Sequence, residues 1–414
     1  MMDVTAIKAQ DYDPFSPEVM RNPLPYYAEL RRSDSIFYSA KYDAFFLSRF
    51  SDILELLGYT DNTFIASEGT LPVPAALAVH NAGAPALPPT NPFPLSQRLG
   101  MPIHGEVRRA HMKPLLPRSV TELRDFVSKR ANERLDELIA QRHFDLTREF
   151  GGIVSGNVIA RLLGMPLELG ETVLDLVNAG SLADPVTGGV DTRAAAQKVI
   201  ALILPWVERR FEAGADGSYP LIDGMIGYRF ENEALTPEQV AQQIACAVIG
   251  GVETVPKVVA HGLMELNARP EQMAAVRADL KAAVPKLAEE MIRFCAPAQW
   301  FMRTAHKPVT IAGQRIEPGQ RVFYIAASAA RDEREFDEPD EFRWDRPIRR
   351  TLAFGHGMHF CIGTHLARME VQVLVETFLS RVHRFHFDLE ESVRLPSSFQ
   401  WGWNSLSVSI EEAE

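Results

Sequence analysis

A long, uninterrupted helical pattern near the middle of the chain constrains its fold more than any other feature. The pattern starts at Thr236–Gln239, sequence TPEQ, which combines a capping box with a proline at the first helical position. It can continue to about Asn267, where Arg269-Pro270 stops it. At 1.5 Å per residue this helix would be roughly 45–50 Å long, enough to cross a whole domain. Its centre, Ala245–Val252, is uncharged and mostly small, so we expect 236–267 to be the central helix.

The rest of the chain predicts a mainly α fold with a small β part. Helical spacing covers most of 103–267 and returns at 284–295 and 363–382, whereas strand signals occur at 309–311 and 315–326. The length of 414 residues suits one large α-rich domain as well as two smaller ones.

Residues 71–102 differ in character from their surroundings, because eight of these 32 residues are proline. One interpretation is a linker between domains. We favour a structured substrate loop, since apolar residues such as Phe93 and Leu95 alternate with the prolines.

Composition excludes several classes of protein. A formal net charge of −11 argues against a general nucleic-acid binder. Three widely spaced cysteines, Cys246, Cys295 and Cys361, cannot form a disulfide framework. The first 20 residues lack a signal-peptide pattern, and the apolar stretch Ile244–Val252 is about half the ~20 residues that span a bilayer. We expect a cytoplasmic protein that is not membrane-bound.

The segment 352–370, LAFGHGMHFCIGTHLARME, places Cys361 after a glycine-containing loop and directly before a helical pattern. Free backbone N–H groups at a helix start stabilise a thiolate. Three interpretations compete. Cys361 could be an ordinary buried cysteine, one ligand of a zinc site with His356, His359 and His365, or the thiolate ligand of a haem.

The run Phe354-x-x-Gly357-x-His359-x-Cys361-x-Gly363 resembles the haem-binding signature of the cytochrome P450 family at every defining position. The resemblance implies that Cys361 is the axial iron ligand, that Phe354 packs near its sulfur, and that His359 reaches a haem propionate. Gly355 and Gly357 let the loop turn tightly.

Glu290-x-x-Arg293 lies on one face of the helical segment 284–295, as an ordinary surface pair would. The family has such a pair upstream of its cysteine, locked to a third arginine. The resemblance leaves Arg343 and Arg346 as candidates for that arginine, and it assigns Arg303 to a propionate.

The central helix carries Gly250-Gly251-Val252-Glu253-Thr254. Adjacent glycines cost roughly 1 kcal/mol each inside a helix, which close helix packing or a neighbouring ligand would explain. By resemblance, Thr254 donates a hydrogen bond at the oxygen site and Glu253 relays protons. Pro256 departs from the expected pattern and should loosen the helix there.

His104 and Arg108, four residues apart near a helix start, resemble the pair that binds both haem propionates. The motifs occur in the family's order from 104 to 363. The resemblance therefore implies one cytochrome P450 domain over 1–414, with haem between the central helix (236–267) and the cysteine loop and helix (352–382).

The activity so implied is monooxygenation, the hydroxylation or oxidative dealkylation of a substrate with O2 and two electrons. No length remains for a reductase domain, so electrons should come from NAD(P)H through a ferredoxin-type donor and its reductase. The donor would dock on basic residues near the cysteine side of the haem. These are Arg108, Arg109, Lys113, Arg118, Arg346, Arg349 and Arg350.

The predicted substrate is a small hydrophobic molecule, such as an aromatic, an aryl ether or a terpenoid. The residues expected to line its pocket are mostly apolar: Phe93, Leu95, Ala247, Val248, Ala298, Trp300, Phe301, Phe399 and Trp401, with Arg98, Gln299 or Gln400 to orient a polar group. Two alternatives remain open, a peroxide-driven relative and a non-catalytic haem-binding sensor. We expect a monomer.

Overall fold

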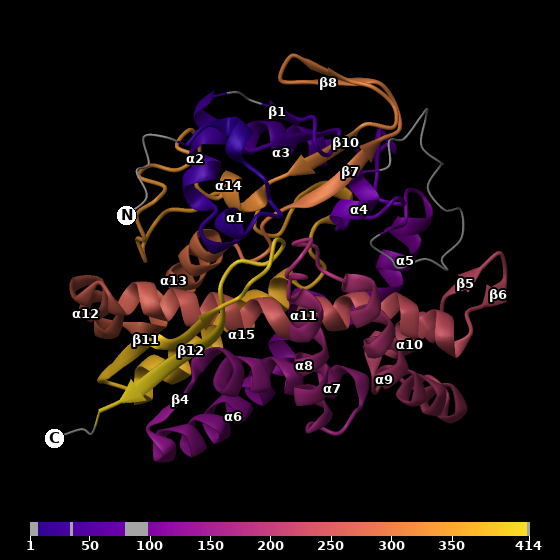
Figure 1. Cartoon of the computed structure of the whole chain (residues 1–414). Coiled ribbons are helices and arrows are strands. Elements are labelled where there is room, and N and C mark those ends of the chain that lie inside the picture. The colour runs from indigo at the N-terminus through magenta and orange to yellow at the C-terminus, as the bar shows by residue number, and fades with distance from the viewer. Residues whose placement is uncertain (1–6, 34–35, 79–97, 412–414) are drawn as a thin grey trace.

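The central helix of the computed structural model, α11 (Pro237–Asn267), runs across the middle of the molecule (Figure 1). The structure describes residues 7–33, 36–78 and 98–411. The predicted capping box is present, because the Thr236 hydroxyl accepts from the Gln239 N–H and the Gln239 side chain accepts from the Thr236 N–H. An 18-residue window of α11 is apolar enough to cross a membrane, but 67% of that window is buried inside the protein. α11 is therefore a core helix.

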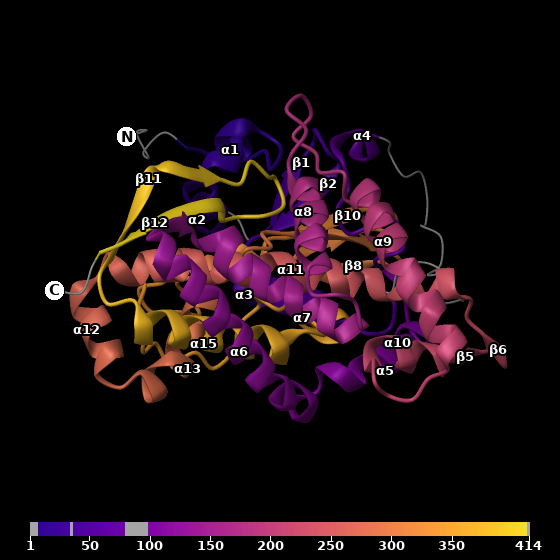
Figure 2. The ribbon, with the colours of Figure 1, turned by 90° about the horizontal axis from the view of Figure 1, so that it is seen from below.

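Most of the other helices surround α11. Figure 2 shows α6 and α7 on the side of α11 and α15 that faces away from the five-stranded sheet. The main helices are α5 (Ile103–Met112), α6 (Pro117–Gln141), α7 (Ile153–Leu163), α8 (Leu169–Ser181), α9 (Thr192–Ala213), α10 (Pro220–Ile226), α12 (Pro270–Ala278), α13 (Leu280–Cys295) and α15 (Thr364–Arg381), with the π-helical turn η5 (Leu146–Gly152) before α7. Their apolar faces form the largest core cluster.

The N-terminal part packs on the main sheet, whose strand order is β1-β2-β10-β7-β3. All pairs are antiparallel except β2 with β10. The strands are β1 (Ile36–Ser39), β2 (Ala44–Leu47), β3 (Phe64–Ile65), β7 (Phe301–Ala305) and β10 (Arg321–Tyr324). The short helices beside them are η2 (Ala9–Asp11), α1 (Pro17–Arg21), α2 (Leu24–Ser33), α3 (Phe50–Gly58), α4 (Pro74–Leu77) and α14 (Ala326–Ala329).

The remaining strands form small sheets. Strands β11 (Phe385–Arg394), β12 (Trp403–Ile410) and β4 (His143–Asp145) pair in that order. Two hairpins are β5 (Arg229–Phe230) with β6 (Glu233–Ala234), and β8 (Val309–Ile311) with β9 (Gln314–Ile316). The mainly α fold with a small β part is thus confirmed.

Some boundaries differ from the sequence-based expectation. The helix expected from 284 begins at Leu280, because the Asp279 side chain caps it. The strand signals over 315–326 belong to β9 and β10, which are separated by the turn that Pro318-Gly319 predicts; φ of Gly319 is +91°. Of the proline-rich region, only 71–78 and 98–102 are described, so Phe93 and Leu95 lie outside the described residues.

Candidate active site

Cys361 lies between the short helix η6 (Gly357–His359) and α15, whose N-cap is Gly363. Its backbone N–H donates to the Phe354 carbonyl at 2.8 Å, which closes the loop into a compact turn. Burial raises the pKa of the Cys361 thiol, while the Gly363 N–H and the charges of Arg108 and Arg368 act in the opposite direction. The thiol is therefore buried at a place where a cationic partner would favour its ionised form.

The aromatic ring of Phe354 is held beside this loop by Arg368. The guanidinium lies 4.8 Å from the ring centroid, and Glu289 fixes it through two hydrogen bonds of 2.6 and 3.0 Å. Phe354 thus has a defined position on the cysteine side of the site.

Two glycines allow the loop to adopt its path. Gly355 and Gly357 have φ values of +70° and +66°. A Cβ on Gly357 would also collide with the Leu57 carbonyl at the end of α3. Gly357 therefore permits close packing of the loop against α3, in addition to the tight turn predicted from the sequence.

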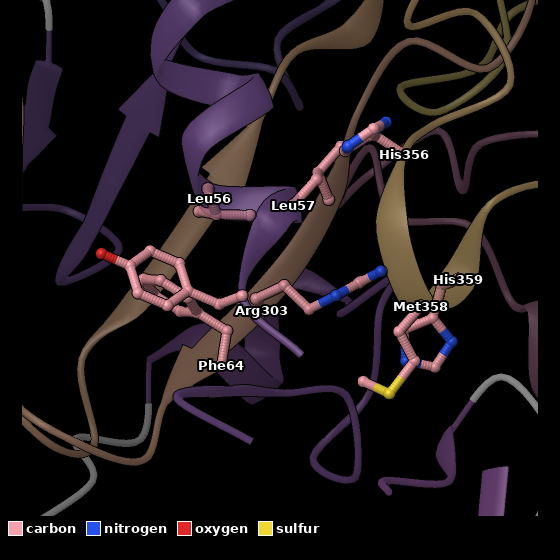
Figure 3. A pocket seen from close by; sticks show the side chains of 8 residues that line it. Leu56, Leu57, Phe64, Arg303, His356, Met358 and His359 are labelled. Carbon is pink, nitrogen blue, oxygen red and sulfur yellow. The ribbon is translucent and has the colours of Figure 1, made fainter. Parts of the chain in front are cut away.

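Four basic side chains gather beside the cysteine loop: His104, Arg108, Arg303 and His359. The rings of His104 and His359 have centroids 4.4 Å apart. Arg303 extends toward His359 across a pocket that Leu57 and Phe64 also line (Figure 3). These four residues come from α5, β7 and η6, so only the tertiary fold brings them together.

The electrostatics of this cluster fit an anionic ligand. Burial, together with the charges of Arg108 and Arg303, lowers the pKa of His104 to about 4. Burial likewise lowers the pKa of His359, again with contributions from both arginines. Within the described part of the chain, none of the four has a carboxylate within ion-pair distance. Two haem propionates would supply the missing negative charge.

The middle of α11 presents an open face in the same region. Gly250 is exposed although most of the surrounding helix is buried, and a Cβ built on it would contact nothing within 4 Å. The Thr254 hydroxyl, one turn later, donates to the Gly250 carbonyl at 3.3 Å. Cys246, one turn earlier, has a pKa raised to about 12 by burial, with Cys361 as a second cause. This open face and the cysteine loop are therefore neighbours, as a bound haem requires.

The two adjacent glycines serve different purposes. A Cβ on Gly251 would lie 2.5 Å from Cδ1 of Ile159 on α7, so Gly251 permits close helix packing. Gly250 instead leaves space on the open face. The two explanations considered for the pair thus apply to one glycine each.

Glu253 is buried and held by two partners. Lys257 Nζ donates to its Oε1 at 2.8 Å, and Gln400 Nε2 donates to its Oε2 at 2.8 Å. Burial lowers the pKa of Lys257, and Glu253 opposes that shift. The spacing of Glu253 and Lys257 was a usable sequence signal for this pair. Gln400 had no such signal, because it lies in a distant turn.

Pro256 does not interrupt α11, which continues to Asn267. Its ring packs against Gly151 of η5, where a Cβ would come within 3.0 Å of the proline Cα. Proline still removes one backbone donor from the helix beside Thr254.

The third arginine of the Glu290 network is Arg346. Arg293 makes two hydrogen bonds of 2.7 Å to the Glu290 carboxylate, and Arg346 Nε donates to the same group at 3.2 Å. Arg343 contributes only its backbone N–H, because its side chain pairs with Glu338. Glu290 and Arg293 are fully buried, so this network belongs to the core.

Several residues expected to line the substrate pocket are packed in the core or line another hollow. Trp300 and Val248 are fully buried in the core, and the Trp300 indole donates to the Ser398 carbonyl at 2.7 Å. Trp401 lines a separate hollow together with Arg394. The assignment of these three residues to the substrate pocket stays a prediction, because alternation and aromatic content do not distinguish a pocket wall from a packed core.

The other candidates have mixed surroundings. Ala247 is half-buried and precedes Gly250, on the open face of α11, by about one helical turn. Phe301 and Phe399 pack edge to face, 5.2 Å apart, while Ala298 forms a bridge with Gln400. Gln400 and Gln299, expected to orient a polar group of the substrate, both have protein partners. Gln400 binds Glu253, and Gln299 accepts from the Tyr27 hydroxyl at 2.8 Å. The side chain of Arg98 is exposed near Gly69.

The zinc interpretation fails. Among the described residues, no three His, Cys, Asp or Glu side chains are grouped so that they could hold a metal ion. Cys295 is buried with its sulfur near the Val258 carbonyl. A thiolate-ligated haem is the remaining interpretation that the donor set fits.

The comparisons with known proteins agree with this geometry. The family model described as cytochrome P450 matches residues 172–412. A putative cytochrome P450 123 from Mycobacterium tuberculosis is 28% identical over 411 residues, which is 96% of each chain. The solved structure of the cytochrome P450 CYP109Q5 from Chondromyces apiculatus is 29% identical, covers 97% of this chain and 98% of its own, and has a TM-score of 0.79. This chain therefore belongs to the cytochrome P450 family of haem-dependent monooxygenases.

Proposed function

We propose that this protein hydroxylates or oxidatively dealkylates a small hydrophobic substrate, using O2 and electrons from a separate ferredoxin-type donor. We further propose that residues 1–414 form one domain, and that the protein is a cytoplasmic monomer without a membrane or nucleic-acid partner. The observation that carries the proposal is the convergence of three features. These are the Cys361 loop, the four basic side chains beside it, and the open face of α11 at Gly250 and Thr254.

In this proposal Cys361 provides the thiolate that holds haem b, and the propionates lie against His104, Arg108, Arg303 and His359. The haem supplies oxygen activation, for which an electron-donating thiolate favours O–O cleavage. The protein's own groups position the substrate, exclude water and move protons.

Proton delivery is assigned to Thr254 and Glu253. Thr254 already points its hydroxyl at the Gly250 carbonyl on the open face, so rotation about one bond would redirect that donor. Glu253, the preceding residue, projects from a different face of the helix, where Lys257 and Gln400 hold its carboxylate. We propose that this carboxylate reaches the Thr254 side only when one of those hydrogen bonds opens.

The docking surface for the electron donor is smaller than the sequence suggested. Arg346 is buried in the Glu290 network, and Arg350 makes two hydrogen bonds of 2.7 and 2.6 Å to Glu335. Arg118 lies within 3.7 Å of Glu122. The exposed basic residues that remain are Arg109, Lys113 and Arg349. We propose that they bind an acidic partner.

Carbon monoxide binding to the reduced protein tests the haem-thiolate assignment. We expect the red-shifted Soret band of a thiolate-ligated haem, and we expect Cys361→Ser to lose it. Cys295→Ser is the matched control, since that cysteine is buried away from the site, and it should keep the band. A folded wild-type protein that binds no haem would contradict the proposal.

Turnover separates the proposed enzyme from its alternatives. A sensor would show the Soret band but no product with any donor system. A peroxide-driven enzyme would form product equally well with hydrogen peroxide alone, and Thr254→Ala would not slow it. Compounds that convert the ferric haem from low to high spin would identify the substrate class to use.

A further inference from the structure

A second hollow lies beside the C-terminal end of α11 and shares no lining residue with the pocket near the cysteine loop. It has a volume of about 670 Å³, within the usual size of small-molecule sites. Its walls come from α1, α2, the C-terminal half of α11, α13, the segment after α14, and the end of β11, which lie on the same side of the molecule (Figure 1). The residues are Arg21, Asn22, Leu24, Pro25, Ala28, His261, Glu265, Arg269, Phe294, Arg331, Asp340, Arg394 and Trp401.

The charges in this hollow do not balance. Four arginines face two carboxylates. Glu265 pairs with Arg269 at 2.7 Å, and Asp340 pairs with Arg331 at 3.1 Å. Burial lowers the pKa of His261, so its ring adds no charge at neutral pH. Arg21 and Arg394 have no carboxylate within 4 Å among the described residues.

Arg394 is held firmly although it lacks an ionic partner. Its guanidinium lies 3.9 Å from the ring centroid of Trp403 and 4.9 Å from that of Trp401. This stacking fixes the direction of its N–H groups. Its Nη1 is nevertheless buried without a hydrogen-bond acceptor.

Trp401 presents a second unsatisfied donor. The residue is 9% exposed, and its indole Nε1 is buried without an acceptor. Nη1 of Arg394 and Nε1 of Trp401 are both closed off from solvent, so contact with a ligand falls to the other nitrogens of the Arg394 guanidinium. A water molecule could accept one hydrogen bond, but it would leave the charge of Arg394 unbalanced.

We propose that this hollow binds an organic carboxylate, whose oxygens accept from the guanidinium of Arg394. A guanidinium matches a carboxylate with two parallel hydrogen bonds. The apolar body of the ligand would lie against Phe294, Leu24 and Pro25 on the opposite walls. This site is distinct from the haem site and does not depend on the proposed monooxygenase activity.

The experiment uses the haem-loaded protein and 2-naphthoate, with the neutral 2-naphthamide as its isostere. Isothermal titration should show 2-naphthoate binding at least tenfold more tightly than the amide. The Soret spectrum should not change, because the ligand binds away from the haem. Equal binding of acid and amide would overturn the proposal.

Variants locate the binding. Arg394→Gln should weaken 2-naphthoate binding at least tenfold, and the exposed Arg21→Gln about threefold. Arg193→Gln, on the exposed start of α9, is the control and should bind like the wild type. If Arg394→Gln does not fold, Arg21→Gln and the amide comparison decide the question. A Soret shift on binding, unaffected by these variants, would place the ligand in the haem cavity and refute the site.

Discussion

At the residue scale, Lys257 holds the carboxylate of Glu253 in place. The pair lies on one turn of α11 with both side chains almost fully buried, 2% and 3% exposed. Removing one member of a buried ion pair leaves an uncompensated charge. The proton-relay role proposed for Glu253 would therefore depend on a neighbour that no haem motif contains.

Lys257→Met should destabilise the protein by about 3–5 kcal/mol, because Glu253 would then be a buried carboxylate without a counter-ion. Urea unfolding of the haem-loaded protein measures this change. The double variant Glu253→Gln/Lys257→Met should recover part of the loss. If the double variant is as unstable as the sum of both single variants, the two residues are not coupled.

Glu370 offers a pH-dependent test on α15. It is 1% exposed, and within the described part of the chain its carboxyl group accepts a hydrogen bond only from the Ser155 hydroxyl, at 2.7 Å. Burial raises its pKa from 4.5 to about 8. The folded protein therefore keeps a proton on Glu370 at pH values where the unfolded chain has lost it. Stability from this group is complete below pH 4.5 and falls as the pH rises toward 8.

Glu370→Gln should remove that dependence, since the amide does not ionise. The stability of the variant relative to wild type should increase by about 1.4 kcal/mol per pH unit between pH 5.5 and 7.5. Urea midpoints at both pH values give the comparison. Glu376→Gln, partly exposed on the same helix, serves as the control and should show no such trend. A pH-independent difference for Glu370→Gln would contradict the raised pKa.

At the scale of elements, α11 performs two structural tasks with two neighbouring glycines. Gly251 allows α7 to approach, and Gly250 opens the face toward the cysteine loop. In the sequence the two glycines form a single motif. In the fold each of them has different neighbours.

Alanine substitutions separate these tasks. Gly250→Ala should stabilise the folded protein by about 0.5–1 kcal/mol through helix propensity, because its Cβ meets no atom. It should also alter the haem spectrum, since the methyl group enters the open face. Gly251→Ala should be at least 1 kcal/mol less stable than Gly250→Ala, because Ile159 must move. Equal unfolding midpoints for the two variants would disprove the division.

At the scale of the whole molecule, the net charge of −11 conceals a local basic surface. Arg109 and Lys113 are exposed at the end of α5, the helix that also carries Arg108 toward the cysteine loop. Electrostatic complementarity mainly accelerates association and depends on salt.

Arg109→Glu and Lys113→Glu should each slow reduction by a ferredoxin-type donor several-fold at low salt, with a smaller effect at high salt. Stopped-flow reduction kinetics measure the rate, and spin-shift titration should show unchanged substrate affinity. Lys281→Glu, on α13 at the other end of the molecule, carries the same charge change and should leave the rate unaffected. If all three variants slowed reduction equally, the cause would be the change in net charge, and the proposed docking surface would be contradicted.

Much of the fold was predictable because local rules specify it. The capping box, the periodicity of α11 and the glycine-bounded cysteine loop each act over a few residues, and each appears at its expected place. Pocket lining was less predictable. Trp300, Val248 and Trp401 share the composition of a pocket wall, but packing with distant segments gives each of them another role.

The sequence by itself determined the family and the order of the motifs, and it predicted the cysteine ligand, because these depend on residue type and short spacing. Only the tertiary structure decided which arginine joins Glu290, what holds Glu253, and where Trp401 lies. Arg346 and Gln400 reach their partners from segments 56 and 147 residues away, and Trp401 lines a hollow whose other walls come from distant segments. No local rule encodes such contacts, because they depend on how the helices and sheets pack around α11.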